Sequence, residues 1–207
     1  MTYSNLNVLV NFTSVNAADP VEPNFQAPGN YKKPESIAKY VEETRNNYYD
    51  GGGAMKDVYN ANIWSASFTF GAETGDGKYE AQDLLDTSSV YGDSLGREQG
   101  NEAAKTVAQR LVQLCSDPDH QVVFYGFGIR FFLKNVAIRS ALAGFSVPAD
   151  LWINSRNYVD LESVICPAGD TELSADQACK ILTGETLEAV KSSTDLQIAL
   201  ASTLGIL

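Results

Sequence analysis

The pattern of apolar and polar positions in the first half of the chain predicts a group of strands. Residues 6–12 form a short apolar run rich in Val and Leu, which is typical of a buried strand. Residues 62–71 have the composition of a second strand, and residues 78–91 can add one or two more around the turn Gly75-Asp76-Gly77. We expect these strands to form an antiparallel meander.

A loop and a helix are predicted between the first two strands. Residues 14–29 are rich in Pro, Asn and Ala, which favours a long loop. Pro34 is well suited to a first helical turn, and the residues after it place Ile37, Tyr40 and Val41 on one helical face. We expect this helix to end among Asn46, Asn47 and the glycine run 51–53.

The second half of the chain predicts helices around one more strand. Residues 101–115 have apolar side chains at helical spacing, and residues 121–125 form a short apolar run that is typical of a central strand. Further helices are predicted over residues 132–143, 174–182 and 186–204. This order of elements predicts an α/β fold with a mixed sheet, and the length and composition predict a single domain over residues 1–207.

The net charge and the cysteine content bear on nucleic-acid binding and on the state of the thiols. The formal net charge of −11 opposes a broad nucleic-acid footprint, although nucleic-acid binding through a local basic groove stays possible. Three clusters could build such a groove: Lys32 with Lys33, Arg130 with Lys134 and Arg139, and Arg156. The three cysteines, Cys115, Cys166 and Cys179, are odd in number and widely spaced, so we expect free thiols.

The sequence gives no sign of a membrane span or of a secretory signal. No run of eighteen apolar residues occurs, and the first fifteen residues lack a basic segment followed by an apolar one. We therefore expect no membrane partner and a location in the cytoplasm of the host cell or in a virion.

Three short stretches together resemble a known enzyme family. They read Asn30-Tyr31-Lys32-Lys33-Pro34-Glu35, then Gly126-Phe127-Gly128-Ile129-Arg130-Phe131-Phe132-Leu133, and then Arg156-Asn157-Tyr158-Val159-Asp160-Leu161. In order and spacing the chain resembles the DEDD superfamily of 3′-5′ exonucleases, in the subgroup similar to the proofreading domain of family B polymerases that occurs in bacteria and phages. The resemblance implies an RNase H-like mixed sheet with flanking helices.

The resemblance also implies a catalytic site, and its acidic residues are largely replaced here. The family holds two divalent metals with four carboxylates, one metal for the attacking hydroxide and one for the leaving oxygen. Asn11 and Thr13 stand at the positions of its Asp-x-Glu motif, and Leu133 stands at the second-motif aspartate. Asp195 matches the last aspartate, but Lys191 takes the place of the tyrosine four residues earlier, and the single histidine lies far upstream at position 120.

We therefore predict a pseudo-exonuclease without catalytic residues, metal or cofactor, retained as a structural or binding module. GxGxxG, GxxxxGK[ST], HExxH and CxxC motifs do not occur in the sequence. Buried carboxylates are costly without metals, so a chain released from catalysis can replace them at little cost in stability.

The predicted partners are other protein subunits. We expect the apolar C-terminal tail, residues 204–207, to be ordered, and an ordered terminus favours a chain held in a larger assembly. Because the family subgroup is common in phages, a capsid-associated virion protein is the leading version. Two alternatives stay open: a nucleic-acid-binding accessory of replication or recombination, and an active metal-dependent 3′-5′ exonuclease with displaced ligands.

Overall fold

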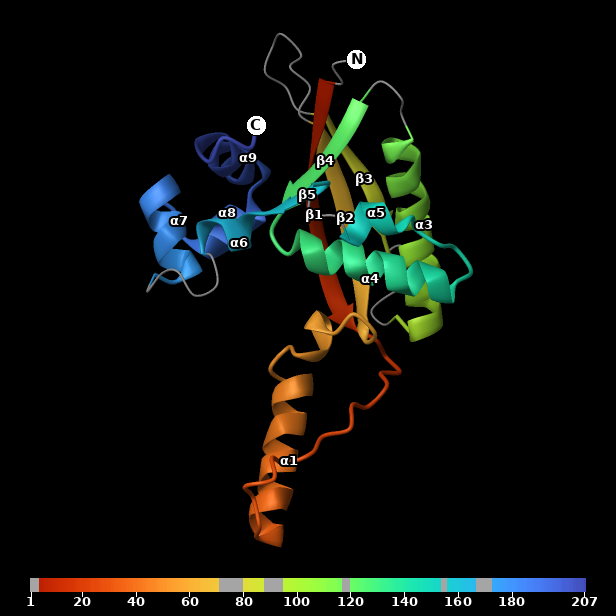
Figure 1. Ribbon diagram of the computed structural model, residues 1–207, viewed down its shortest axis with the longest axis vertical. Coiled ribbons are helices and arrows are strands. Elements are labelled where there is room, and N and C mark those ends of the chain that lie inside the picture. Colours follow the sequence, from red (N-terminus) through yellow and green to blue (C-terminus); the bar gives the residue numbers. More distant parts are fainter. Residues whose placement is uncertain (1–3, 71–79, 88–94, 117–119, 154–155, 167–172) are drawn as a thin grey trace.

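The computed structural model describes residues 4–70, 80–87, 95–116, 120–153, 156–166 and 173–207. The turn predicted at residues 75–77 lies outside this part of the chain. Five strands form one sheet: β1 (Ser4–Asn16), β2 (Ala61–Phe70), β3 (Glu80–Asp86), β4 (His120–Gly126) and β5 (Tyr158–Asp160). Figure 1 shows β1 in the middle of the sheet, with helices beside it and one helix standing far from it.

The strand order is β3-β2-β1-β4-β5. β1 pairs with β2 and β2 with β3 in antiparallel fashion, which confirms the predicted meander. β4 pairs parallel with β1 on one side and with β5 on the other, which confirms it as an internal strand. The prediction of an α/β fold with a mixed sheet and flanking helices is therefore correct.

The described helices are α1 (Pro34–Tyr49), the 3-10 helix η1 (Ala54–Lys56), α3 (Arg97–Cys115), α4 (Ile129–Leu142), α5 (Ala149–Ile153), α6 (Leu161–Ile165), α7 (Ala175–Thr183), α8 (Leu187–Ser192) and α9 (Thr194–Thr203). The single helix predicted over residues 186–204 is divided in two. Ser193 ends α8 and caps α9, its hydroxyl accepting a hydrogen bond from the Leu196 amide. A serine side chain competes well for such amides, which makes it a favourable helix start.

Helices cover both faces of the sheet because β1 is apolar on both of its faces. Val8 and Val10 point into one core with α3 and α4, while Leu9, between them, points into a second core with α6 to α9. Strands that are buried on both faces read as continuous apolar runs, as residues 6–12 do. The first core also contains Phe68 and Phe124, whose rings lie 5.9 Å apart.

The C-terminal tail is held by the chain itself. Leu204 and Ile206 pack against the second core, and the Ile206 amide donates to the Ala201 carbonyl at 2.9 Å. The tail thus has contacts within its own chain, and the expected assembly with other subunits stays a prediction.

The expected free thiols are confirmed, since Cys115, Cys166 and Cys179 are all unbridged. Burial raises the pKa of the Cys115 thiol to about 11. None of the helices in the described ranges is long and apolar enough to cross a membrane.

Residues 17–60, which we call the arm, leave the end of β1 and return to the start of β2 (Figure 1). Near the base of the arm, Asn60 is 2% exposed. Its side-chain oxygen accepts from the Val21 amide at 2.8 Å, and its Nδ2 donates to the Val21 carbonyl at 2.7 Å. The Asn60 amide also donates to the Tyr48 hydroxyl at 2.8 Å, and that hydroxyl donates to Asp57 at 2.5 Å. These bonds tie the outgoing loop, α1 and the returning segment together.

A buried arginine fixes the return of the arm to the body. Arg139 of α4 is fully buried and donates to the Tyr59 carbonyl at 2.5 Å, to the Asn62 side chain, and to the Arg97 carbonyl at 2.9 Å. Burial lowers the pKa of its guanidinium to about 10. One turn earlier, Asn135 donates to the Ala61 carbonyl at 3.0 Å. Arg139 is therefore unavailable for the basic groove that its sequence neighbours suggested.

Replacing Arg139 by methionine should lower the free energy of unfolding by about 3 kcal/mol, because the carbonyls of Tyr59 and Arg97 and the Asn62 side chain would lose their donor inside the protein. Urea denaturation measures the change. Arg130→Met, an exposed arginine on the same helix, is the matched control and should change stability by about 0.5 kcal/mol or less. Equal stability of the two variants would show that the buried hydrogen bonds of Arg139 do not stabilise the fold.

Ionisation of Tyr48 should lower the free energy of unfolding at alkaline pH. Burial, with the neighbouring Asp57 carboxylate, raises its pKa from 10.0 to about 12. The folded protein then keeps a proton that the unfolded chain loses, so this stabilisation is complete below pH 10 and disappears as the pH rises to 12. Tyr48→Phe should lose about 1 kcal/mol at pH 7 and show a flatter decline between pH 10 and 12 in chemical denaturation.

The control for this prediction is Tyr59→Phe, since the side chain of Tyr59 is 55% exposed. It should follow the wild-type protein at every pH. If Tyr48→Phe loses as much stability between pH 10 and 12 as the wild type does, the pH effect comes from other groups.

Candidate functional site

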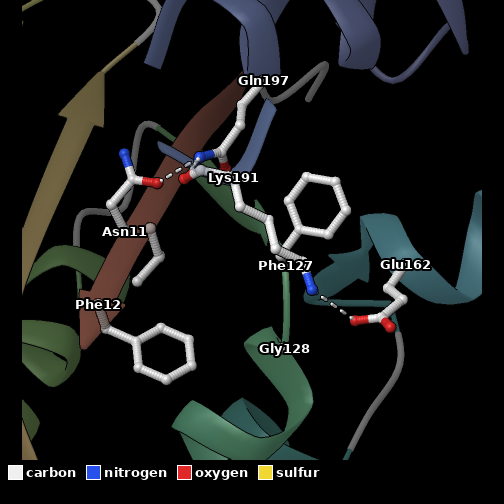
Figure 2. A pocket seen from close by; sticks show the side chains of 8 residues that line it. Asn11, Phe12, Phe127, Gly128, Glu162, Lys191 and Gln197 are labelled. Carbon is white, nitrogen blue, oxygen red and sulfur yellow. Dashed lines mark hydrogen bonds and ion pairs between the residues drawn. The ribbon is translucent and has the colours of Figure 1, made fainter. Parts of the chain in front are cut away.

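Four segments that are distant in sequence meet at one pocket. It is lined by Val10, Asn11 and Phe12 from β1, Phe127 and Gly128 from the turn between β4 and α4, Glu162 from α6, Lys191 from α8 and Gln197 from α9. Figure 2 shows the Lys191 side chain running between the Asn11–Gln197 pair and Glu162, beside the Phe127 ring. The segments of β1, of the β4–α4 turn and of α8–α9 are those in which the resemblance places its motifs.

Asn11 is held by hydrogen bonds to the last helix. Its side-chain oxygen accepts from Gln197 Nε2 at 2.8 Å, and its Nδ2 donates to Thr194 Oγ1 at 3.3 Å. Gln197 is 2% exposed, and its Nε2 also donates to the Lys191 carbonyl at 2.8 Å. Neutral amides and a hydroxyl thus join β1 to the start of α9.

Lys191 brings a positive charge into the pocket. Its Nζ lies 3.4 Å from Glu162 Oε2 and 5.4 Å from the centroid of the Phe127 ring. An ammonium over an aromatic face and beside a carboxylate is favourable, although both ends of this ion pair reach solvent, which keeps its contribution small. A fixed ammonium also repels any divalent cation that approaches the same space.

A wider hollow adjoins the pocket and shares Asn11, Phe12 and Lys191 with it. Its remaining lining is mostly hydroxyl and carboxylate groups from β1, β2, β3 and the α8–α9 junction: Thr13, Ser65, Ser67, Asp83, Asp86, Ser192 and Thr194, with Ala66 and Leu85. Thr13 lies opposite Ser65 in the β1–β2 pairing, and their hydroxyls are 2.7 Å apart. Thr13 is exposed and lies on the hollow, as its sequence position suggested.

The other two sequence-predicted positions lie elsewhere. Asp195 is exposed in the first turn of α9, next to Thr194, and lines neither of the two hollows described above. Leu133 is 2% exposed and belongs to the first core. Leu133, the position matched to the second-motif aspartate, therefore packs in the core and lines neither hollow. The reason is the apolar stripe of Ile129, Phe132, Leu133 and Val136, which turns this side of α4 toward the sheet.

The turn before α4 explains the glycine at position 128. Gly128 has a φ of 67°, in the left-handed region that glycine adopts without strain. The glycine at this position therefore serves the backbone conformation of the turn into α4.

Asp160 has a structural role that the motif comparison did not reveal. One oxygen accepts from the Gly128 amide at 3.3 Å and from the Glu162 amide at 3.2 Å, and the other accepts from the Arg130 amide at 3.4 Å. A carboxylate at helix N-termini is stabilised by unpaired amides and by the helix dipole. An aspartate is a favoured residue directly before a helix, so the place of Asp160 before Leu161 could have predicted this capping role from the sequence.

The pocket's donor set does not suit a pair of hard divalent cations, which require several oxygen ligands and preferably charged ones. Asn11 Oδ1 is already bonded to Gln197, and Glu162 is paired with Lys191. Within the described part of the chain, no group of three or more His, Cys, Asp or Glu side chains could hold a metal ion. Glu162 and Gln197 were not singled out from the sequence, because neither belongs to a stretch or position on which the resemblance rests.

Asn11→Leu should lower stability by about 1–2 kcal/mol, because Gln197 and Thr194 would each lose a hydrogen-bond partner in a largely buried place. Asn11→Asp should stay within about 0.5 kcal/mol of the wild type, since it keeps the acceptor for Gln197 and adds a negative charge beside Lys191. Thermal and urea unfolding of the two variants measure this difference. A loss in Asn11→Asp as large as in Asn11→Leu would show that the amide network is not what holds β1 to α9.

No protein-family model matches this chain, and no curated protein matches it at a significant level. The likeness to the DEDD exonucleases rests on the order of the three sequence stretches. It stays a prediction, which the meeting of β1, the β4–α4 turn and the α8–α9 junction at one pocket makes worth testing.

Proposed function

We propose that this chain is a catalytically inactive protein of the exonuclease, RNase H-like type that serves as a structural or binding module, in its leading version as a capsid-associated subunit of a phage virion. The observation that carries the proposal is the make-up of the pocket. Asn11, which the resemblance matches to a metal-binding carboxylate, is bonded to the amide of Gln197 in this pocket, and Lys191 adds a positive charge beside Glu162.

The electrostatics of the pocket support the loss of catalysis. Hydrolysis of a phosphodiester by this family requires cations that generate hydroxide and stabilise the leaving oxygen. Lys191 supplies one positive charge, which Glu162 offsets at 3.4 Å. Asp83 and Asp86 add negative charge to the adjoining hollow and would repel a phosphate backbone.

The hydrogen bonds of the pocket support survival of the fold without metal. A cluster of carboxylates needs cations to neutralise it, whereas neutral amides can bond to one another without a counter-charge. Gln197 donates both to Asn11 and to the Lys191 backbone, so the same side chain joins β1, α8 and α9. Replacement of the acids therefore lets this edge of the sheet stay ordered.

The arm supports a role in binding other proteins. It holds much exposed apolar surface, and α1 has no buried residue along its 16 positions. Catalysis at the distant pocket would not require such a projection, whereas contact with a neighbouring subunit would. The phage virion as the setting rests on the family resemblance.

Incubation of the full chain with 5′-labelled single-stranded DNA and Mg²⁺ or Mn²⁺ tests the proposal. We expect no metal-dependent shortening, and no difference between the wild type and Asp195→Ala. Shortening that requires the metal and disappears in Asp195→Ala would refute the proposal and identify an active exonuclease with displaced ligands.

Measuring the affinity of the chain for the same DNA in low-salt buffer tests the alternative that the protein binds nucleic acid. We expect binding weaker than micromolar, because the chain carries a net charge of −11. Submicromolar binding with a steep dependence on salt would favour the replication or recombination accessory instead.

A further inference from the structure

We propose that the chain associates head to tail with a second copy of itself, with the tip of one copy's arm seated on the acidic C-terminal helices of the next copy. The arm tip is residues 28–39, and the receiving surface is the outer side of α6, α7 and α8. The inference deepens the proposed function, on which it rests for the structural role, by naming the partner.

The arm tip carries apolar surface that its own copy leaves exposed. Ile37 and Tyr31 are each 37% exposed, and Tyr31 contacts Tyr40 with ring centroids 4.9 Å apart. Figure 1 shows α1 standing well away from the sheet and from its other helices. Short helices are marginal in water unless an apolar face is covered, so α1 would gain stability from a partner.

The arm tip is also basic within an acidic protein. Lys32, Lys33 and Lys39 are exposed there against the single acid Glu35. The ion pair of Lys39 with Glu43, at 3.7 Å, is highly exposed and leaves the lysine accessible. A basic, partly apolar helix start suits a partner surface that is acidic and partly apolar.

The C-terminal helices provide such a surface. Four acidic residues and two basic ones lie on α6, α7, α8 and the segment between α7 and α8: Glu162, Asp176, Glu185 and Glu188, against Lys180 and Lys191. Glu185 and Glu188 are exposed at the junction of α7 and α8. Ile181 of α7 is 71% exposed and Val164 of α6 is 42% exposed, so these helices also carry exposed apolar side chains.

The two surfaces lie on different parts of the molecule, which decides the geometry of association. In Figure 1 the arm extends from one end of the sheet, while α6 to α9 lie to one side of the sheet, away from α1. Each copy therefore offers one tip and one receiving surface, a heterologous contact that builds rings or filaments. A repeating structural subunit requires contacts of this kind.

A nucleic acid fits the arm less well than a second copy does. Glu35, Glu42 and Glu43 follow the lysines on α1, and all three are exposed. They would repel a polyanion lying along the helix, whereas a compact acidic protein surface can meet the tip alone.

Sedimentation velocity on the full chain across a concentration series in low-salt buffer tests the inference. We expect the mass to at least double with concentration and to fall again in high salt. Lys32→Glu with Lys33→Glu should abolish the increase, and so should Ile181→Asp on the receiving surface. The matched control, Arg130→Glu with Lys134→Glu, changes the same charge at exposed positions of α4 and should associate like the wild type.

Mixing the two interface variants gives the decisive result. Each should be monomeric alone, but together they should form dimers, because one intact tip and one intact receiving surface remain. A wild-type chain that is monomeric at every concentration, association that survives both variants, or a mixture that stays monomeric would each overturn the inference. Circular dichroism verifies that all variants are folded, and the nuclease assay tests the loss of catalysis separately.

Discussion

The structure depends on one buried cation, Arg139. Its guanidinium extends from α4 and donates to Tyr59 at the end of the arm, to Asn62 of β2 and to Arg97 at the start of α3. Burial of an arginine is costly unless it is hydrogen-bonded, and here both terminal nitrogens of the guanidinium are bonded, so these acceptors must hold their places. The packing of α3 is part of this constraint: a side chain at Gly100 would collide with Asn62 and Arg139. Through its bonds to Asn62 and to the Tyr59 carbonyl, Arg139 also fixes where the arm rejoins the sheet.

The pocket at the end of β1 is held by polar contacts between elements that are distant in sequence. The Asn11 and Gln197 amides link β1 to α9, and Asp160 accepts hydrogen bonds from amides at the starts of α4 and α6. These contacts join β1, α4, α6 and α9, which gives the polar side chains a structural role in the fold.

Most of the fold could be predicted from local patterns. The apolar run at residues 6–12, the helical spacing at residues 101–115 and the proline at position 34 each marked an element that the structure contains. The elements that were missed, η1, α5, β5 and α6, have three to five residues each, too few for a period to appear. The break at Ser193 was also missed, because the apolar spacing continues across it while the serine hydroxyl caps the next helix.

The sequence by itself determined the element types, the free thiols, and the presence of an amide and a hydroxyl at positions 11 and 13. Only the tertiary structure decided that Leu133 packs in the core, that Arg139 is buried, and that Lys191 reaches the pocket of Asn11. The reason is that side-chain placement depends on contacts across long separations, such as the 186 residues between Asn11 and Gln197. Periodicity describes which face of a helix is apolar, whereas the packing of that face against a particular strand decides which site its residues share.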